Sequence, residues 1–168
     1  MQNLPDEPKA EGVILVVDDD EAILELLRAT LDHSGYSVHT APNGEQALAF
    51  AARLHQRIDL LISDFQMPGA NGVELHEELC RRYGYIPVLV VSGIPDAIQA
   101  SYPSLPFLQK PFRMAALLAR VRSILAERTA AAAEVSVWVA LNRLWEAPTP
   151  PPRPPVAQPV LPLPVSLK

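Results

Sequence analysis

The stretch Leu60-Leu61-Ile62-Ser63-Asp64-Phe65-Gln66-Met67-Pro68-Gly69 decides the fold of this sequence. Its first residues are a short apolar run bounded by turn signals, which is typical of a buried strand in a parallel sheet. Met67, Pro68 and Gly69 then favour a turn over continued strand pairing. Asp64 is therefore predicted at the carboxyl end of a buried strand, the edge where open α/β sheets bind ligands. A lone acid there more often caps a helix or starts a turn, so its role depends on what else reaches this edge.

Further strand candidates recur along the chain, most of them apolar runs and one of them, residues 36–40, an alternating segment. Stretches with helical spacing of apolar residues separate these candidates. The expected strands are residues 13–17, 36–40, 58–63, 86–91 and 106–108, and the apolar stripes of the helices lie within 23–31, 47–54, 72–82, 96–101 and 114–125. Five strands alternating with five helices predict right-handed βαβ crossovers and a parallel sheet covered on both faces. The fold class is α/β and doubly wound, because a closed eight-stranded barrel needs about 250 residues.

Length and composition fit one globular domain with an appendage. The chain has 168 residues, of which 49% are hydrophobic and 20% charged, and its net charge is −5. This charge provides no basic footprint for nucleic acid. The single cysteine, Cys80, excludes an internal disulfide, suits the reducing cytoplasm and is expected to pack as a small apolar residue. We see neither a secretory signal nor an apolar run near the ~20 residues that span a bilayer, so no membrane contact is expected.

Polar side chains that suit phosphoryl chemistry follow the predicted strands. Asp18 and Asp19 follow the first strand, Asp64 the third, Ser92 the fourth and Lys110 the fifth. Three carboxylates at one edge repel one another unless a cation joins them, and oxygen ligands of this kind suit Mg²⁺. Lys110 would add a positive charge and Ser92 a hydroxyl that can bond a phosphoryl oxygen. These are the parts that phosphoryl transfer needs, with Asp64 as the nucleophile that forms an aspartyl phosphate.

At these positions the chain resembles the receiver domain of bacterial two-component response regulators, over about residues 12–127. The motifs that carry the resemblance are Val16-Val17-Asp18-Asp19, Asp64-Phe65-Gln66-Met67-Pro68-Gly69, Val91-Ser92-Gly93 and Lys110-Pro111-Phe112. The resemblance implies a flavodoxin-like, CheY-like sheet of strand order 2-1-3-4-5. It also implies phosphoryl transfer from a histidine kinase or a histidine phosphotransfer protein. The segment 107–112 is most similar to receivers attached to hybrid histidine kinases.

The resemblance also implies a role for each matching residue. The Mg²⁺ ligands would be Asp18, Asp19, Asp64 and the backbone carbonyl of Gln66. Asp64 would be the phospho-acceptor, contacted after transfer by Lys110 and Ser92. Ser92 and Phe107 would form the switch, although Phe107 lacks the hydroxyl that the family often has at this position. Such a protein is not an enzyme beyond the phosphorylation and dephosphorylation of its own aspartate.

Two features between Ser92 and Lys110 depart from the best-known family pattern. Only 17 residues separate them, and Pro95, Pro103 and Pro106 lie among these residues. We therefore expect a shortened fourth helix and a reshaped signalling face. Ile94, beside the site, is apolar and poor at orienting water, which predicts a slowly hydrolysed phosphoryl group.

The ends of the chain differ in composition from the domain between them. Residues 1–11 are expected to be a disordered leader, and residues 148–168 a disordered, proline-rich tail that holds nine of the 18 prolines. Alanine-rich sequence favours a helical extension over residues 128–147, although Val135, Val137 and Val139 also allow a strand. Its apolar residues, including Trp138 and Trp145, predict docking, a homodimer or a partner contact.

These features predict a stand-alone response regulator of a two-component phosphorelay. Its output would come through protein–protein contact, because the 40 residues after Arg128 cannot hold a helix-turn-helix or a second catalytic domain. The alternative is a receiver-fold interaction scaffold that is not phosphorylated. An aspartyl phosphatase ranks last, since Gln66 stands where its second acid would be.

Overall fold

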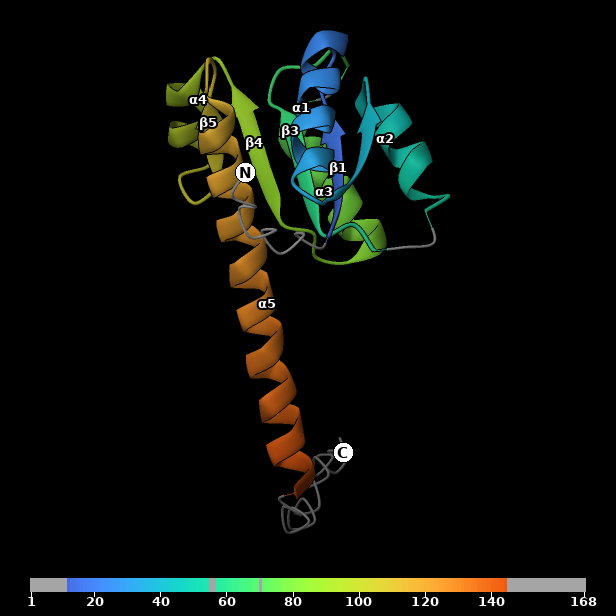
Figure 1. Cartoon of the computed structure of the whole chain (residues 1–168), viewed down its shortest axis with the longest axis vertical. Helices are drawn as coiled ribbons and strands as arrows, with labels where there is room; N and C mark the ends of the chain where they lie inside the picture. The colour runs from blue at the N-terminus through green and yellow to red at the C-terminus, as the bar shows by residue number, and fades with distance from the viewer. Residues whose placement is uncertain (1–11, 55–56, 70, 145–168) are drawn as a thin grey trace, which may run out of the picture. The chain divides into compact units, whose positions relative to one another are not determined.

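The structure is a computed structural model that describes residues 12–54, 57–69 and 71–144. Its centre is a five-stranded parallel sheet with the order β2-β1-β3-β4-β5 (Figure 1). The strands are β1 (Val13–Val17), β2 (Ser37–Ala41), β3 (Leu60–Asp64), β4 (Val88–Ser92) and β5 (Phe107–Gln109). The predicted fold class and strand order are therefore confirmed.

Each strand is followed by a helix, as the alternation in the sequence predicts. The helices are α1 (Glu21–His33), α2 (Gly44–Ala51), α3 (Gly72–Tyr83), α4 (Pro95–Ser101) and α5 (Met114–Leu144). Helix α4 has 7 residues, so the predicted shortening is confirmed. Helix α5 has 31 residues and continues through the predicted boundary between residues 127 and 128, where the sequence suggested a separate extension.

The sheet is buried on both faces because its central strands are mostly apolar. All five residues of β1 are buried, as are the first four of β3. One face packs on α1 and α5, through residues such as Leu24, Leu27, Leu31, Leu117 and Val121. The other face packs on α2, α3 and α4, through residues such as Ala47, Ala51, Val73, Leu79 and Ile98. This two-sided burial explains why the strands read as continuous hydrophobic runs.

Short polar residues fix the starts of the helices beside the carboxyl edge of the sheet. The Asp20 side chain caps α1 by accepting from the backbone N–H groups of Ala22 and Ile23. Asn71 and Glu74 form a reciprocal capping box at the start of α3. Such caps stabilise a helix by about 1 kcal/mol each and hold the preceding loop in place.

Asp59, which precedes β3, joins α5 to the amino-terminal ends of the strands, opposite the carboxyl edge. Its carboxylate accepts a hydrogen bond from the Val13 backbone N–H (2.8 Å) and pairs with the Arg128 guanidinium. Arg128 also donates to the Asp59 carbonyl (3.2 Å). These contacts tie α5 to the starts of β1 and β3.

The chain divides into two compact units, Met1–Ala132 and Ala133–Lys168. The sheet and helices α1 to α4 belong to the first unit. Within the second, the backbone is described as helix up to Leu144, which is the predicted helix rather than the alternative strand. The predicted leader and tail, and the side-chain stripes with Trp138 and Trp145, lie outside the described residues. None of the helices in the described ranges is both long enough and apolar enough to cross a membrane.

Replacing Leu31 by Ala tests the packing of α1 on the sheet. Leu31 is fully buried, so the truncation is expected to lower the free energy of unfolding by about 2–5 kcal/mol, measured by urea denaturation. Leu26→Ala on the same helix is the control, because Leu26 is 52% exposed and should change stability by no more than about 0.5 kcal/mol. Equal losses in the two variants would contradict this packing.

Candidate functional site

The strand register brings the predicted site residues to one edge of the sheet. Val17 of β1 pairs with Ser63 of β3, so Asp18 and Asp64 each lie one residue further along neighbouring strands. Asp64 in turn pairs with Val91 of β4, and Ser92 pairs with Gln109 of β5. Lys110 is the next residue after Gln109. The positions that the sequence analysis selected thus meet at the carboxyl edge of the sheet.

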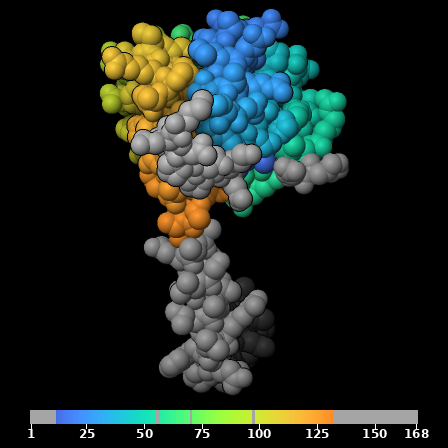
Figure 2. Space-filling view, in the orientation of Figure 1, coloured from blue at the N-terminus to red at the C-terminus, as the bar shows by residue number. Residues whose placement is uncertain are grey.

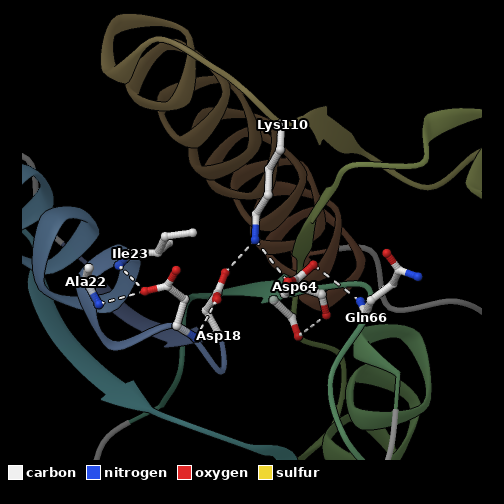
Figure 3. Close-up of polar contacts among 8 residues, drawn as sticks. Asp18, Ala22, Ile23, Asp64, Gln66 and Lys110 are labelled. Carbon is white, nitrogen blue, oxygen red and sulfur yellow. Dashed lines mark hydrogen bonds and ion pairs between the residues drawn. The ribbon is translucent and has the colours of Figure 1, made fainter.

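Lys110 connects the two buried acids directly. Its Nζ donates to Asp18 Oδ2 (2.8 Å) and to Asp64 Oδ2 (2.9 Å), and Figure 3 shows it pointing between them. The Asp18 side chain is only 3% exposed and the Asp64 side chain 12% exposed. Buried carboxylates need a charged or hydrogen-bonding partner, and Lys110 is a partner of both.

The ion pair accounts for the protonation state of Lys110. Burial of the ammonium by itself lowers the pKa of Lys110. Hydrogen bonds to Asp18 and Asp64, together with the negative charges of both carboxylates, outweigh burial and raise this pKa above its usual value. Because the pKa is raised, the contribution of the charged lysine is fully present at neutral pH and is lost only as the pH rises through the folded-state pKa.

A third carboxylate leaves the site with excess negative charge. Asp18, Asp19 and Asp64 each offer an oxygen, and these oxygens lie within 4.8 Å of one another. Three carboxylates (−3) and one ammonium (+1) give a local charge of −2, which a single divalent cation would neutralise. Clustered hard oxygen donors fit Mg²⁺. The residues present therefore fit the metal that the sequence predicted.

Hydrogen bonds to the backbone orient both buried acids. Asp18 Oδ1 accepts from the Asp20 N–H (3.0 Å), and Asp64 Oδ1 accepts from the Gln66 N–H (3.3 Å), as Figure 3 shows for Gln66. The hydrogen bond from the Gln66 N–H is a turn contact, which was the simpler role expected for a lone acid after a strand. That contact coexists with the ion pair between Asp64 and Lys110. The role of the Gln66 carbonyl as a ligand stays a prediction.

The two predicted switch residues lie on adjacent strands beside the site. Ser92 ends β4 and is fully buried, and its Oγ accepts from the Ile94 N–H (3.0 Å). Phe107 begins β5, pairs with Val90 and packs partly buried against the core. Ser92 follows Val91, the strand partner of Asp64, and Phe107 lies one strand further along the sheet. Their part in a switch stays a prediction.

Sequence reasoning missed two kinds of contact. Ser63 donates to the Asp64 carbonyl oxygen and Gly72 closely approaches the same atom, but neither residue carried a signal in the sequence by itself. Cys80 packs against the core as expected, but its sulfur also accepts from the Ile86 N–H (3.4 Å) and lies 3.2 Å from His76 Nε2. His76 Nε2 is in turn 2.8 Å from the Ile86 carbonyl oxygen. The spacing of His76 and Cys80, four residues apart on one helix, was the signal available for this pair.

The family model of the response regulator receiver domain matches residues 14–122, and the chain belongs to this family. The match includes the whole sheet except Val13, the first residue of β1, together with the carboxyl-edge residues described above. Receiver domains of two-component systems are the class in which an acidic cluster and a lysine of this arrangement are expected, so the predicted family is confirmed.

Individual relatives agree with this assignment. Response regulator MprA of Mycobacterium leprae (strain TN) is 38% identical over 117 residues, which cover 67% of this chain and 50% of that protein. The solved receiver domain of the hybrid histidine kinase CckA is 36% identical, covering 68% of this chain and 99% of that one, with a TM-score of 0.59. Chemotaxis protein CheY4 of Vibrio cholerae is 30% identical with the same coverage and a TM-score of 0.59. This chain spans about half the length of the mycobacterial regulator.

The ion pair predicts a specific response of Lys110 to mutation. Asp18→Asn removes one negative charge beside Nζ, so the pKa of Lys110 should fall toward its usual value. The chain has three lysines, Lys9, Lys110 and Lys168, so the side-chain Cε signals can be followed individually in an NMR titration. The other two lysines serve as internal controls. A Lys110 titration that is the same in both proteins would contradict the ion pair.

Proposed function

We propose that this protein is a phospho-acceptor of a two-component phosphorelay, in which Asp64 receives a phosphoryl group from a phosphohistidine. The observation that carries the proposal is the contact of Lys110 Nζ with Asp18 and Asp64 at the carboxyl edge of the sheet. Family membership supports it. The buried pair gives Asp64 the fixed position that phosphoryl transfer requires, since this chemistry depends mostly on positioning and charge.

In the proposed reaction a carboxylate oxygen of Asp64 attacks phosphorus. A P–O bond forms to the aspartate while the P–N bond of the donor breaks, and its electron pair leaves with the imidazole nitrogen. Lys110, already beside Oδ2, is placed to follow the charge onto the phosphoryl oxygens. The Ser92 hydroxyl, now an acceptor for the Ile94 N–H, is the group we assign to the remaining phosphoryl contact.

Asp18, Asp19, Asp64 and the Gln66 carbonyl would hold the Mg²⁺ ion. When bound, the metal neutralises charge on the phosphoryl oxygens as they approach the carboxylates. The protein's own contribution is to keep Asp18 buried and to orient its carboxylate through the hydrogen bond from the Asp20 N–H. We propose no activity for this chain beyond the phosphorylation and dephosphorylation of its own aspartate.

An apolar groove beside the site supports a protein rather than a small molecule as the donor. The groove has a volume of about 400 Å³ and is lined by Ile23, Leu26, Leu27, Lys110, Pro111, Phe112 and Met114. In Figure 2 the blue surface of α1 adjoins the yellow to orange surface of the segment after β5. Leu26 is 52% exposed at its rim. A donor helix with an apolar face could dock here and present its histidine to Asp64.

The same proposal covers output and location. Output would come through protein–protein contact, because the net charge of −5 gives no basic surface that would favour nucleic acid. The single cysteine suits the reducing cytoplasm, where we place the protein. The competing function is a scaffold that uses the receiver fold without phosphorylation.

Incubation with acetyl phosphate and Mg²⁺ separates these two functions. The intact mass is expected to rise by one phosphoryl group, and this adduct should be absent in Asp64→Asn and when EDTA replaces the metal. Asp96→Asn is the matched control, since Asp96 lies in the first turn of α4 and has no assigned role. Absence of an adduct with both acetyl phosphate and phosphohistidine donors would leave only the scaffold.

The groove predicts a difference between protein and small-molecule donors. Leu26→Glu places a charge on the docking surface, so transfer from a phosphorylated histidine phosphotransfer domain should slow by about tenfold or more. Uptake from acetyl phosphate should be unchanged, because this donor needs no docking surface. Tyr85→Glu is the control, since Tyr85 is 71% exposed but precedes β4 at the opposite edge. Equal slowing with both donors would contradict the docking role of the groove, because the substitution would then act on the phosphorylation site itself.

A further inference from the structure

We infer that Ser63 and Gly72 are positioning residues for Asp64, which hold its main chain so that its carboxylate faces Asp18 and Lys110. The inference deepens the proposed function and rests on it. Neither residue would touch the phosphoryl group. Their effect would pass through the Asp64 backbone alone.

Ser63 holds the Asp64 peptide from within the core. Its side chain is fully buried on the face of the sheet that packs on α2 and α3, two residues after Leu61. Its hydroxyl donates to the Asp64 carbonyl oxygen (3.2 Å). A buried hydroxyl without a partner would be costly, so this bond ties the Asp64 carbonyl to a fixed point inside the domain.

Gly72 lets the first turn of α3 approach the same carbonyl. A Cβ at position 72 would lie 2.3 Å from the Asp64 carbonyl oxygen and 2.7 Å from Ser63 Oγ. The first of these atoms belongs to the backbone, so no side-chain rotation can relieve the clash. The Gly72 N–H also donates to the Phe65 carbonyl (3.3 Å). Only glycine allows this close approach of α3 to the end of β3.

The first turn of α3 is itself fixed by its capping box, so its contact with the Asp64 carbonyl restrains the position of that carbonyl. Asn71 Oδ1 accepts from the N–H groups of Val73 and Glu74 (2.9 Å each), and Glu74 Oε2 accepts from the Asn71 N–H (3.2 Å). The Asp64 carbonyl therefore lies between a buried hydroxyl and a capped helix start. With its peptide held, the Asp64 side chain is directed at Lys110 Nζ and at the Gln66 N–H.

The test compares Gly72→Ala and Ser63→Ala with two control variants. Gly93→Ala makes the same substitution at a glycine where a Cβ meets nothing within 4 Å. Leu31→Ala destabilises the domain without touching the site. For each protein we would measure the Mg²⁺ dissociation constant by calorimetry, and the initial rate of phosphoryl uptake from acetyl phosphate at saturating Mg²⁺ by intact mass. Rates would be expressed per folded molecule, with the folded fraction taken from circular dichroism.

A misplacement of about 1 Å can slow a reaction by about a hundredfold, and Gly72→Ala should approach this loss. Ser63→Ala removes the hydrogen bond to the Asp64 carbonyl without creating a steric clash, so its rate of phosphoryl uptake should fall less. Both should weaken Mg²⁺ binding, whereas both controls should keep wild-type rate and affinity. This pattern separates positioning from stability, because Leu31→Ala is destabilised yet unimpaired.

Wild-type rate and Mg²⁺ affinity in folded Gly72→Ala and Ser63→Ala would overturn the inference. If Gly72→Ala does not fold, Ser63→Ala carries the test, since it removes one oxygen and adds nothing. If the unmodified protein accepts no phosphoryl group, the proposed function fails. The Mg²⁺ affinities then still decide whether the two residues position Asp64.

Discussion

The contact of one lysine with two buried acids is the constraint on which this structure depends. Asp18 and Asp64 end adjacent strands, so their like charges are forced together wherever the sheet forms. Removing the lysine from such a pair would leave uncompensated buried charge, which is strongly destabilising. Lys110 comes from beyond β5, and β4 lies between β5 and β3. The charges are therefore balanced only when β1, β3, β4 and β5 are all paired in the sheet, and an intact site implies that these four strands have formed.

The edge that carries these charges is held by helix starts on either side. Asp20 caps α1 and also donates its own N–H to Asp18, so one residue fixes both the helix and the buried acid. Asn71 caps α3, whose first turn meets the Asp64 carbonyl through Gly72. The acids themselves lie at strand ends, and the loops after them are short. Precise placement follows from these rigid neighbours, because a site supported by capped helices and paired strands has few alternative arrangements.

Much of this arrangement could be predicted from local patterns, and the remainder depends on close tertiary contact. Apolar runs located four of the strands and the alternation over residues 36–40 located the other, and the residues that follow the strands located Asp18, Asp19, Asp64, Ser92 and Lys110. Strand β3 begins at Leu60 rather than Ile58, where Asp59 instead bonds to Val13 and Arg128. No periodicity encodes that ion pair or the fit of Gly72 against Asp64, because partners distant in sequence determine both. Helix α5 continues over the valines at 135–139, since nothing in the alanine-rich sequence before them breaks a helix.

The segment between β4 and β5 has few local interactions of its own to hold it. Helix α4 has seven residues, no side-chain cap hydrogen bond at Ile94 and a proline in its first turn, so it has little intrinsic stability. Ile98 buries it against the core, and β5 beyond it is a three-residue, half-exposed strand. This segment starts directly after Ser92, whose hydroxyl now accepts from the Ile94 N–H at the α4 cap. If Ser92 turned its hydroxyl toward a phosphoryl group, that hydrogen bond would be the first to break. The short elements α4 and β5 lie immediately beyond it.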